Sequence, residues 1–369
     1  MSKLAKIDLT GAREELRIAL PGLYLVIAVA VVSRYLHSLI PIPAMSRAIS
    51  EVFIAVFLGL HIRNAIHYSH RFDAGIRFAM QHILRFAVVL LGLRLSLQDV
   101  VDTGLRSLLL VLACIALALT LASVAGKLLK IPRRLAVLIG VGTAICGNTA
   151  IVAVAPVIEA KDEDVSFAVA TITFFGTFAV LVYPFIGYFT GMTDREFGIW
   201  AGTAVNDTSQ VVAAGAAFSE AARDVATVVK LTRNALMAPI ILLIGMVYAR
   251  LSDKRSDGQR TRVSWSKAVP GFVIGFIAMA ALRTLGIAVG VLPQSVADPG
   301  ALTGAASLLR AVDEVSKFAV LMALSAIGLG TDVGAVRRTG AKPFVLGLGI
   351  SGVLAVFSAG VILLTGMGR

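Results

Sequence analysis

The chain has 369 residues, of which 57% are hydrophobic and only 15% are charged, and its mean hydropathy is +0.87. This much apolar sequence excludes an ordinary soluble domain and predicts a polytopic α-helical membrane protein. The formal net charge is +12, but the basic residues lie in short patches between apolar runs, which argues against a nucleic-acid-binding protein. Cys114 and Cys146 lie in apolar segments without CxxC spacing and predict neither a disulfide framework nor a zinc site.

Apolar runs of about 20 residues predict membrane-crossing helices, and we expect about eleven of them in one transmembrane domain, 1–369, with no soluble domain. The expected spans are roughly 18–36, 48–62, 79–97, 106–126, 135–158, 166–191, 198–218, 226–249, 268–290, 301–330 and 343–366. Residues 1–17 form a cytoplasmic N-terminal segment, and residues 252–266 form a polar cytoplasmic linker between two halves.

The distribution of lysine and arginine predicts the orientation. If the N-terminus is cytoplasmic, the segments on the inner side carry most of the basic residues, as the positive-inside rule requires. The C-terminus is then periplasmic, and the acidic loop 159–164 is expected on the outer side. The sequence therefore predicts a multi-pass membrane protein whose termini lie on opposite sides of the membrane.

Two apolar runs are interrupted at their centres by glycine and polar residues, at Gly142–Thr149 and at Gly202–Gln210. Gly142-Thr143-Ala144 recurs 60 residues later as Gly202-Thr203-Ala204, so the interruption falls at the same place in both runs. Irregular backbone at membrane depth is tolerated only where it is buried in protein or lines a cavity. Paired interruptions of this kind indicate the binding site of a transporter.

A second internal sequence similarity relates Gly92-Leu93 and Thr103-Gly104 to Gly328-Leu329 and Thr339-Gly340. The two spans concerned are expected to run in opposite directions. This is the pattern of an inverted repeat. The two interrupted segments, however, are separated by one span and would run in the same direction. If they are inversion partners, one of them is re-entrant or a span is miscounted.

The interruptions supply the expected substrate-binding residues. A half-helix that begins at a break presents free N–H groups and the positive end of its dipole to an anion. The alternative is a close helix crossing, in which threonine and asparagine bond to neighbouring helices. The residues expected at the site are Gly147, Asn148, Thr149, Asn206, Thr208, Ser209 and Gln210.

Asp207 is an ionisable residue within a span, where an unpaired charge costs several kcal/mol and suggests function. Asp207 is suited to cap the second half-helix but would repel an anion unless it were protonated or neutralised. We therefore expect it to bind a coupling ion, a proton or sodium. The alternative is a salt bridge to Lys230 or Arg233. These two cations share a helical face and are expected to bind the substrate, with snorkelling as their alternative.

The remaining charged residues are expected to be structural. Arg94 is expected to snorkel to the interface. No histidine has metal-ligand spacing and no nucleophile–base pair is apparent, so neither a metal, a cofactor nor an enzymatic activity is expected. A charged stripe of spacing i, i+3, i+4 and i+7, expected to be internally paired, consists of Arg310, Asp313, Glu314 and Lys317.

The chain resembles the YeiH-type family of bacterial inner-membrane proteins, which carries the label of sulfate exporter. The resemblance extends over nearly the whole chain and rests on Gly142–Ile158, Gln210–Ala214, Lys230–Pro239 and Lys317–Leu329. It implies membership of the cation/proton antiporter and anion transporter group, with a fold similar to bile-acid symporters and sodium/proton antiporters. Such a fold has inverted repeats and two discontinuous helices that cross at the midplane.

The chain also departs from the family pattern. The family usually has His-Glu in place of Asn206-Asp207, and a smaller residue in place of Asn148. Asp207 keeps an acidic residue at the position of the family's glutamate, whereas Asn206 replaces the histidine. The substrate and the coupling ion can therefore differ from those of the relatives.

The sequence thus predicts an all-α secondary active transporter that moves a small anion, sulfate or a related oxyanion or sulfonate, by alternating access. The expected partners are this anion, a proton or sodium ion, the lipid bilayer and a second copy of the chain in a homodimer, with no nucleic acid. A sodium/proton antiporter with Asp207 as its cation site is the alternative function. A passive channel is a further alternative, against which the paired interruptions argue.

Overall fold

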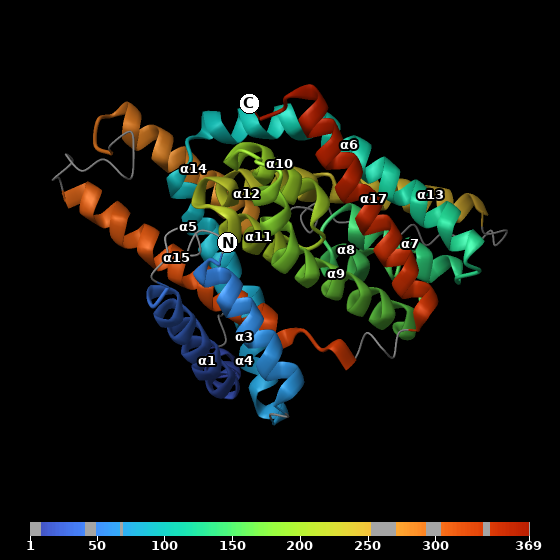
Figure 1. Cartoon of the computed structure of the whole chain (residues 1–369), viewed down its shortest axis with the longest axis horizontal. Coiled ribbons are helices and arrows are strands. Elements are labelled where there is room, and N and C mark those ends of the chain that lie inside the picture. Colours follow the sequence, from blue (N-terminus) through green and yellow to red (C-terminus); the bar gives the residue numbers. More distant parts are fainter. Residues whose placement is uncertain are drawn as a thin grey trace, which may run out of the picture.

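The computed structural model describes residues 9–40, 49–66, 69–251, 271–292, 304–334 and 340–368, and its regular elements there are all helical (Figure 1). The whole of the expected linker, 252–266, and the first eight residues lie outside the described residues. The longer helices are α1 (Leu9–Ser38), α3 (Glu51–Ala65), α6 (Leu97–Leu128), α9 (Asp162–Phe189), α12 (Glu220–Ala235), α13 (Met237–Leu251), α14 (Gly271–Ala288), α15 (Gly304–Gly330) and α17 (Ala341–Thr365).

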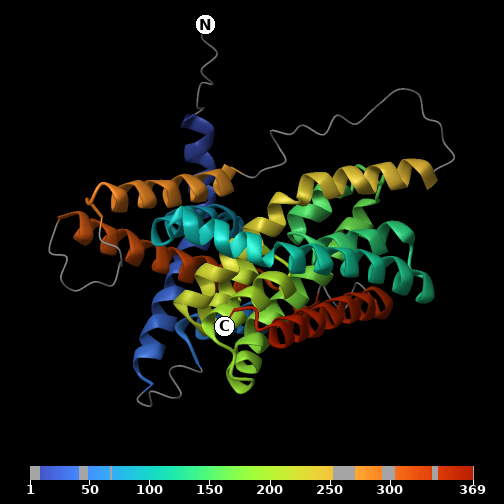
Figure 2. The ribbon, with the colours of Figure 1, turned by 90° about the horizontal axis from the view of Figure 1, so that it is seen from above.

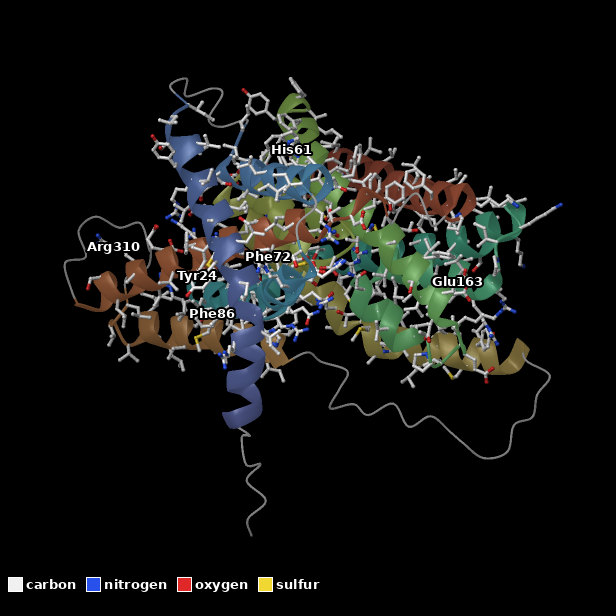
Figure 3. The ribbon with its side chains drawn as sticks, turned by 90° about the horizontal axis from the view of Figure 1, so that it is seen from below. Tyr24, His61, Phe72, Phe86, Glu163 and Arg310 are labelled. Carbon is white, nitrogen blue, oxygen red and sulfur yellow. The ribbon has the colours of Figure 1, made fainter. Side chains whose placement is uncertain are left out.

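Seven helices of the described residues are long and apolar enough to cross a membrane. Their outward faces carry large exposed apolar side chains, such as Tyr24 and Phe86 (Figure 3), which an aqueous surface would not favour. The expected class, a polytopic helical membrane protein, is therefore confirmed, whereas the expected number of eleven spans is not. The seven segments are Arg17–Ser38, His70–Arg94, Leu97–Leu128, Asp162–Phe189, Glu220–Tyr248, Gly271–Ala288 and Ala341–Thr365.

The helices form two groups that pack side by side (Figure 1). The first group contains α1, α3, α14, α15 and the segment 70–94, in which α4 (Asp73–Phe78), a π-helical turn (Ala79–Ile83) and α5 (Leu84–Leu91) follow one another. The second group contains the elements from α6 to α13 together with α17, which lies alongside α6, α7, α9 and α10 (red in Figure 2).

The first interrupted segment is a re-entrant hairpin. Its two helices are α7 (Arg133–Ala144) and α8 (Asn148–Val154). A guanidinium nitrogen of Arg134, in the first turn of α7, lies 3.5 Å from a carboxylate oxygen of Glu159, beyond α8. Gly142 packs against Ile151 within the same pair. Because both ends of the segment meet, 135–158 is not a crossing, and the acidic residue Glu159 lies on the side of Arg134 rather than across the membrane from it.

The second interrupted segment is also a re-entrant hairpin, formed by α10 (Asp194–Ala204) and α11 (Thr208–Phe218). Ser219, directly after α11, donates a 2.7 Å hydrogen bond to Asp194 at the start of α10. Both helices pack along α12, α10 parallel to it and α11 antiparallel. The expected span 198–218 therefore turns back at its polar centre as well.

The two hairpins point at each other. Helix α9 connects the base of the first to the base of the second, and its 28 residues span about 42 Å at 1.5 Å per residue. The bases therefore lie at opposite ends of α9, and the tips meet where Gly147 packs on Asp207: a Cβ at Gly147 would lie 2.7 Å from Asp207 Oδ2. The two hairpins therefore enter the molecule from opposite ends of α9, although this single long helix separates them.

Lys230 and Arg233, on α12, hold the two tips together from behind. Both side chains are completely buried. Lys230 Nζ donates to the carbonyls of Ile145 (2.8 Å), Val205 (3.2 Å) and Asn206. Arg233 donates to Ala144 (2.6 Å), Thr203 (2.9 Å), Val205 (3.0 Å), Gly202 (3.2 Å) and Thr143. The two cations thus cover the negative dipole ends of α7 and α10. Neither snorkels and neither forms an ion pair with Asp207, and both donate to backbone carbonyls of the two tips.

Arg94 joins the two helix groups at the end of the molecule where the second hairpin has its base. It does not snorkel as expected: its guanidinium lies 2.9 Å from Glu220, 3.0 Å from Asp224 and 2.6 Å from Asp313. Lys317 bonds Glu220 at 2.8 Å and Asp313 at 3.0 Å. The charged stripe of α15 is therefore paired partly within itself and partly with α12.

Gly147→Ala should destabilise the protein. Gly147 has φ +62° and ψ −127°, a conformation that side chains disfavour by about 1–3 kcal/mol, and its Cβ would also meet Asp207. We expect a lower unfolding temperature in detergent. Gly352→Ala, on an exposed face of α17 with no atom within 4 Å of the new Cβ, is the matched control. Equal unfolding temperatures for the two variants would contradict the tip contact.

Lys230→Met and Arg233→Met should each unfold the ligand-free protein more readily, because several buried carbonyls lose their donors at about 1–3 kcal/mol each. Arg106→Met, at an exposed site on α6, should leave the unfolding temperature nearly unchanged. If Arg233→Met weakened ligand binding but left ligand-free stability intact, the original expectation of a substrate contact would be restored.

Candidate functional site

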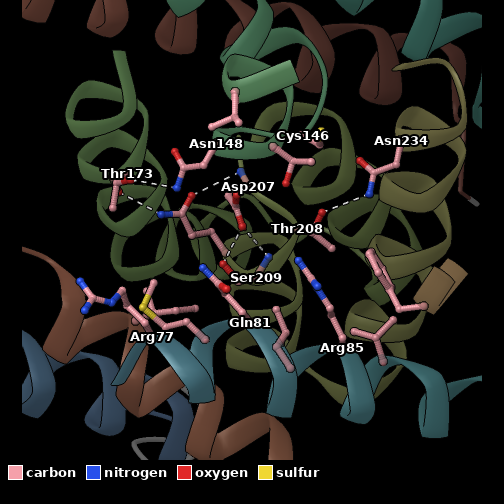
Figure 4. A pocket seen from close by; sticks show the side chains of 18 of the residues that line it. Arg77, Gln81, Arg85, Cys146, Asn148, Thr173, Asp207, Thr208, Ser209 and Asn234 are labelled. Carbon is pink, nitrogen blue, oxygen red and sulfur yellow. Dashed lines mark hydrogen bonds between the residues drawn. The ribbon is translucent and has the colours of Figure 1, made fainter. Parts of the chain in front are cut away.

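A cavity of about 570 Å³ lies between the two helix groups (Figure 4). One wall is formed by the hairpin tips, with Asn148 and Thr149 from α8 and residues 207–210 from α11. The facing wall is formed by the segment 70–94, with Arg77, Gln81 and Arg85. The beginnings of α8 and α11 therefore lie at the cavity, while the ends of α7 and α10 lie behind it on Lys230 and Arg233.

Most of the expected site residues line this cavity, but four of the expected residues lie outside its lining. Asn148, Thr149, Asp207 and the three residues that follow it line the cavity. Gly147 is buried in the tip contact, and Asn206 is only 1% exposed and lies outside the lining. Lys230 and Arg233 are the other two, since they face the carbonyls behind the tips.

Asp207 is the N-cap of α11, as expected. Its Oδ1 accepts hydrogen bonds from the Ser209 amide at 3.0 Å and the Ser209 hydroxyl at 2.7 Å, and Gln210 Oε1 accepts from the Asp207 amide at 3.3 Å. This capping box begins the helix directly after the break. The second carboxylate oxygen, Oδ2, forms no hydrogen bond within the described parts of the chain and faces the tip contact with Gly147. It remains able to accept a proton or a cation.

Amide side chains surround the tips. Gln210 Nε2 donates to the carbonyl of Thr173 at 2.9 Å, and Asn148 Nδ2 lies 3.4 Å from the hydroxyl of Thr173. Asn234 Nδ2 donates to the hydroxyl of Thr208 at 3.1 Å. The oxygens Asn148 Oδ1 and Asn234 Oδ1 are buried and lack a hydrogen-bond partner among the described residues. Since a hydroxyl can donate as well as accept, either amide can reverse and place its NH₂ group where the unpartnered oxygen lies.

The sequence analysis missed Arg77, Gln81 and Arg85, because they were assigned to a basic segment on the inner side of the membrane and to the start of a span. Their spacing of four residues is the signal that could have identified them, since i, i+4 and i+8 share one helical face. The π-helical turn at Ala79–Ile83 lies within this face, and such turns are frequent at functional sites. Thr173 and Asn234 also line the cavity and were not assigned to it.

The cavity has a positive balance of charge. Its charged lining residues are Arg77, Arg85 and Asp207, and neither arginine forms an ion pair with any residue that the structure describes. With Asp207 ionised the lining carries one net positive charge, and with Asp207 protonated it carries two. Among the described residues no group of three or more histidine, cysteine and acidic side chains could hold a metal ion. The arrangement is suited to bind an anion through arginine forks and through hydroxyl and amide donors.

Comparison with known proteins identifies the family. The matching family model, described as Conserved hypothetical protein 698, covers residues 21–347. A UPF0324 membrane protein of Clostridium tetani is 33% identical over 346 residues, which are 91% of this chain and 94% of that protein. UPF0324 membrane proteins of Streptococcus agalactiae and Streptococcus pyogenes are 35% and 37% identical, each covering 89% of this chain and 92% of its relative. The chain therefore belongs to this family of bacterial membrane proteins, the YeiH-type family that its interrupted segments resemble.

Proposed function

We propose that the protein is a secondary active transporter that moves a small anion across the bacterial inner membrane by alternating access. The observation that carries this proposal is the shared cavity, in which two inverted hairpin tips face two unpaired arginines. Transporters commonly place the substrate at the interface of inverted repeats, where broken helices meet. A passive pore does not require such a paired arrangement.

Alternating access requires the cavity to open toward one side at a time. The cavity lies between the two helix groups, and the ion pairs of Arg94 and Lys317 join these groups at the base of the second hairpin. A movement of one group against the other would break these ion pairs and re-form contacts elsewhere. The ion pairs support a closed gate at this end in the conformation that the structure describes.

The expected orientation, with a cytoplasmic N-terminus and a periplasmic C-terminus, is retained in the proposal. Each hairpin returns to the side from which it enters, so two of the expected crossings are removed. The number of crossings stays odd, and the termini stay on opposite sides. The first hairpin, with Arg133 and Arg134 at its base, then enters from the cytoplasm, in keeping with the positive-inside rule.

A sodium/proton antiporter is the second candidate, and one observation favours it. Asp207 Oδ2 and the buried Asn148 Oδ1 are oxygen acceptors without hydrogen-bond partners among the described residues, and oxygen acceptors suit a hard cation. Arg77 and Arg85 argue against this candidate, because two unpaired positive charges on the facing wall repel a cation.

A panel of thermal unfolding measurements on the purified protein separates the two candidates. The ligands are sulfate, sulfite, thiosulfate, small sulfonates and carboxylates, each with and without sodium and at two pH values. A ligand that binds only the folded state at 100 times its Kd raises stability by about 2.7 kcal/mol. We expect stabilisation by an anion, lost in Arg85→Met. If only sodium or a change of pH raises the unfolding temperature and no anion does, the result would instead support the cation antiporter.

Asp207→Asn should retain anion binding and lose its pH dependence. The substitution removes a negative charge from a lining that also contains Arg77 and Arg85, so anion binding should not weaken. The variant has no carboxylate to bind a coupling ion. Affinity measured between pH 5 and 8, with and without sodium, checks this. An unaltered dependence on pH and sodium would remove Asp207 from the coupling role.

A further inference from the structure

The cavity is larger and more apolar than a single inorganic oxyanion requires. Its volume of about 570 Å³ falls within the range of roughly 300–1,000 Å³ that holds organic ligands. A large part of the lining is apolar and comes from both helix groups, with Val152, Ala153 and Met237 from the second group and Leu84, Val88 and Phe272 among those from the first. A fully hydrated tetrahedral ion gains nothing from such a surface, whereas each buried methylene improves affinity about fourfold.

The two cationic side chains of the cavity occupy separate positions along one of its walls. Arg77 and Arg85 are eight residues apart on one helical face, which places their Cα atoms about 12 Å apart along the axis. Figure 4 shows them on either side of Gln81, along the wall that faces the hairpin tips. An ion bound at one guanidinium would leave the other without an ion-pair partner among the described residues.

We propose that the cargo is an organic dianion whose two acidic groups are separated by a short apolar chain, with one group at Arg77 and the other at Arg85. This inference rests on the proposed anion transport and names the class of substrate. Arginine forks bind sulfonate or carboxylate groups in a bidentate manner, and Gln81, between the two arginines, is suited to a polar substituent on the chain.

The test uses the full-length protein and two matched series of ligands. One series consists of straight-chain alkane-α,ω-disulfonates of two to eight carbons, and the other consists of the alkane monosulfonates of the same lengths, with sulfate as the inorganic reference. Affinities are measured by calorimetry in detergent. We expect the affinity of the disulfonates to peak at an intermediate chain length, at least tenfold above the monosulfonate of that length and above sulfate.

Single arginine variants test the two-point contact. Arg77→Gln and Arg85→Gln should each reduce the affinity of the best disulfonate to that of its matched monosulfonate, and Arg77→Lys and Arg85→Lys should restore part of the loss because they keep the charge. Arg106→Gln, on α6 outside the cavity, should change nothing. Both arginines are exposed and unpaired among the described residues, so the ligand-free unfolding temperatures should match that of the original chain, which is checked first.

The outcomes distinguish this inference from the proposed function. If sulfate binds as tightly as every disulfonate, or if each arginine variant weakens both series equally, the proposal of an organic dianion is wrong. Anion transport is unaffected by that result. If neither series nor sulfate nor any other anion of the thermal unfolding panel binds at any pH, the proposed function fails together with the inference. If disulfonates bind with a length optimum and both variants abolish that optimum, the two-point contact is established.

Discussion

The centre of this structure depends on two buried cations that satisfy the ends of two helices. Helices α7 and α10 both stop in the interior, and each leaves its last carbonyl groups without partners in the helix. Lys230 and Arg233 donate to these carbonyls from a single helix, α12, and they also oppose the negative dipole ends that converge there. Without them, a chain reversal at membrane depth would leave several buried acceptors unsatisfied.

The positive charges of Lys230 and Arg233 lie on the side of the hairpin tips that faces away from the cavity. Because the helix ends face α12, the helix beginnings face the cavity, and the polar residues that start α8 and α11 are presented to it together. The cations that remain available to a ligand come from the other helix group, on α4 and α5. In the proposed transporter, substrate contacts would be divided between the two helix groups, so a relative movement of the groups would change binding.

Part of this architecture could be predicted from residues alone. Glycine and polar residues within an apolar run are costly in a lipid-facing helix, so both breaks were located correctly, and Asp207 was correctly expected to cap the second half-helix. The positions of Lys230 and Arg233 were identified as exceptional, but their partners were not. A buried cation looks the same in a sequence whether it faces a ligand or a row of backbone carbonyls, because carbonyls carry no residue-type signal.

The sequence by itself determined the class of protein, the places where two helices break, and the acidic residue at the second break, since all three follow from the cost of polar groups in an apolar medium. The tertiary structure decided the direction of the chain after each break, which depends on contacts at the hairpin bases, such as Arg134 with Glu159, between residues 25 positions apart. It also decided which charges face the cavity, because Arg77 and Arg85 become part of the site only when a separate group of helices packs across from the tips.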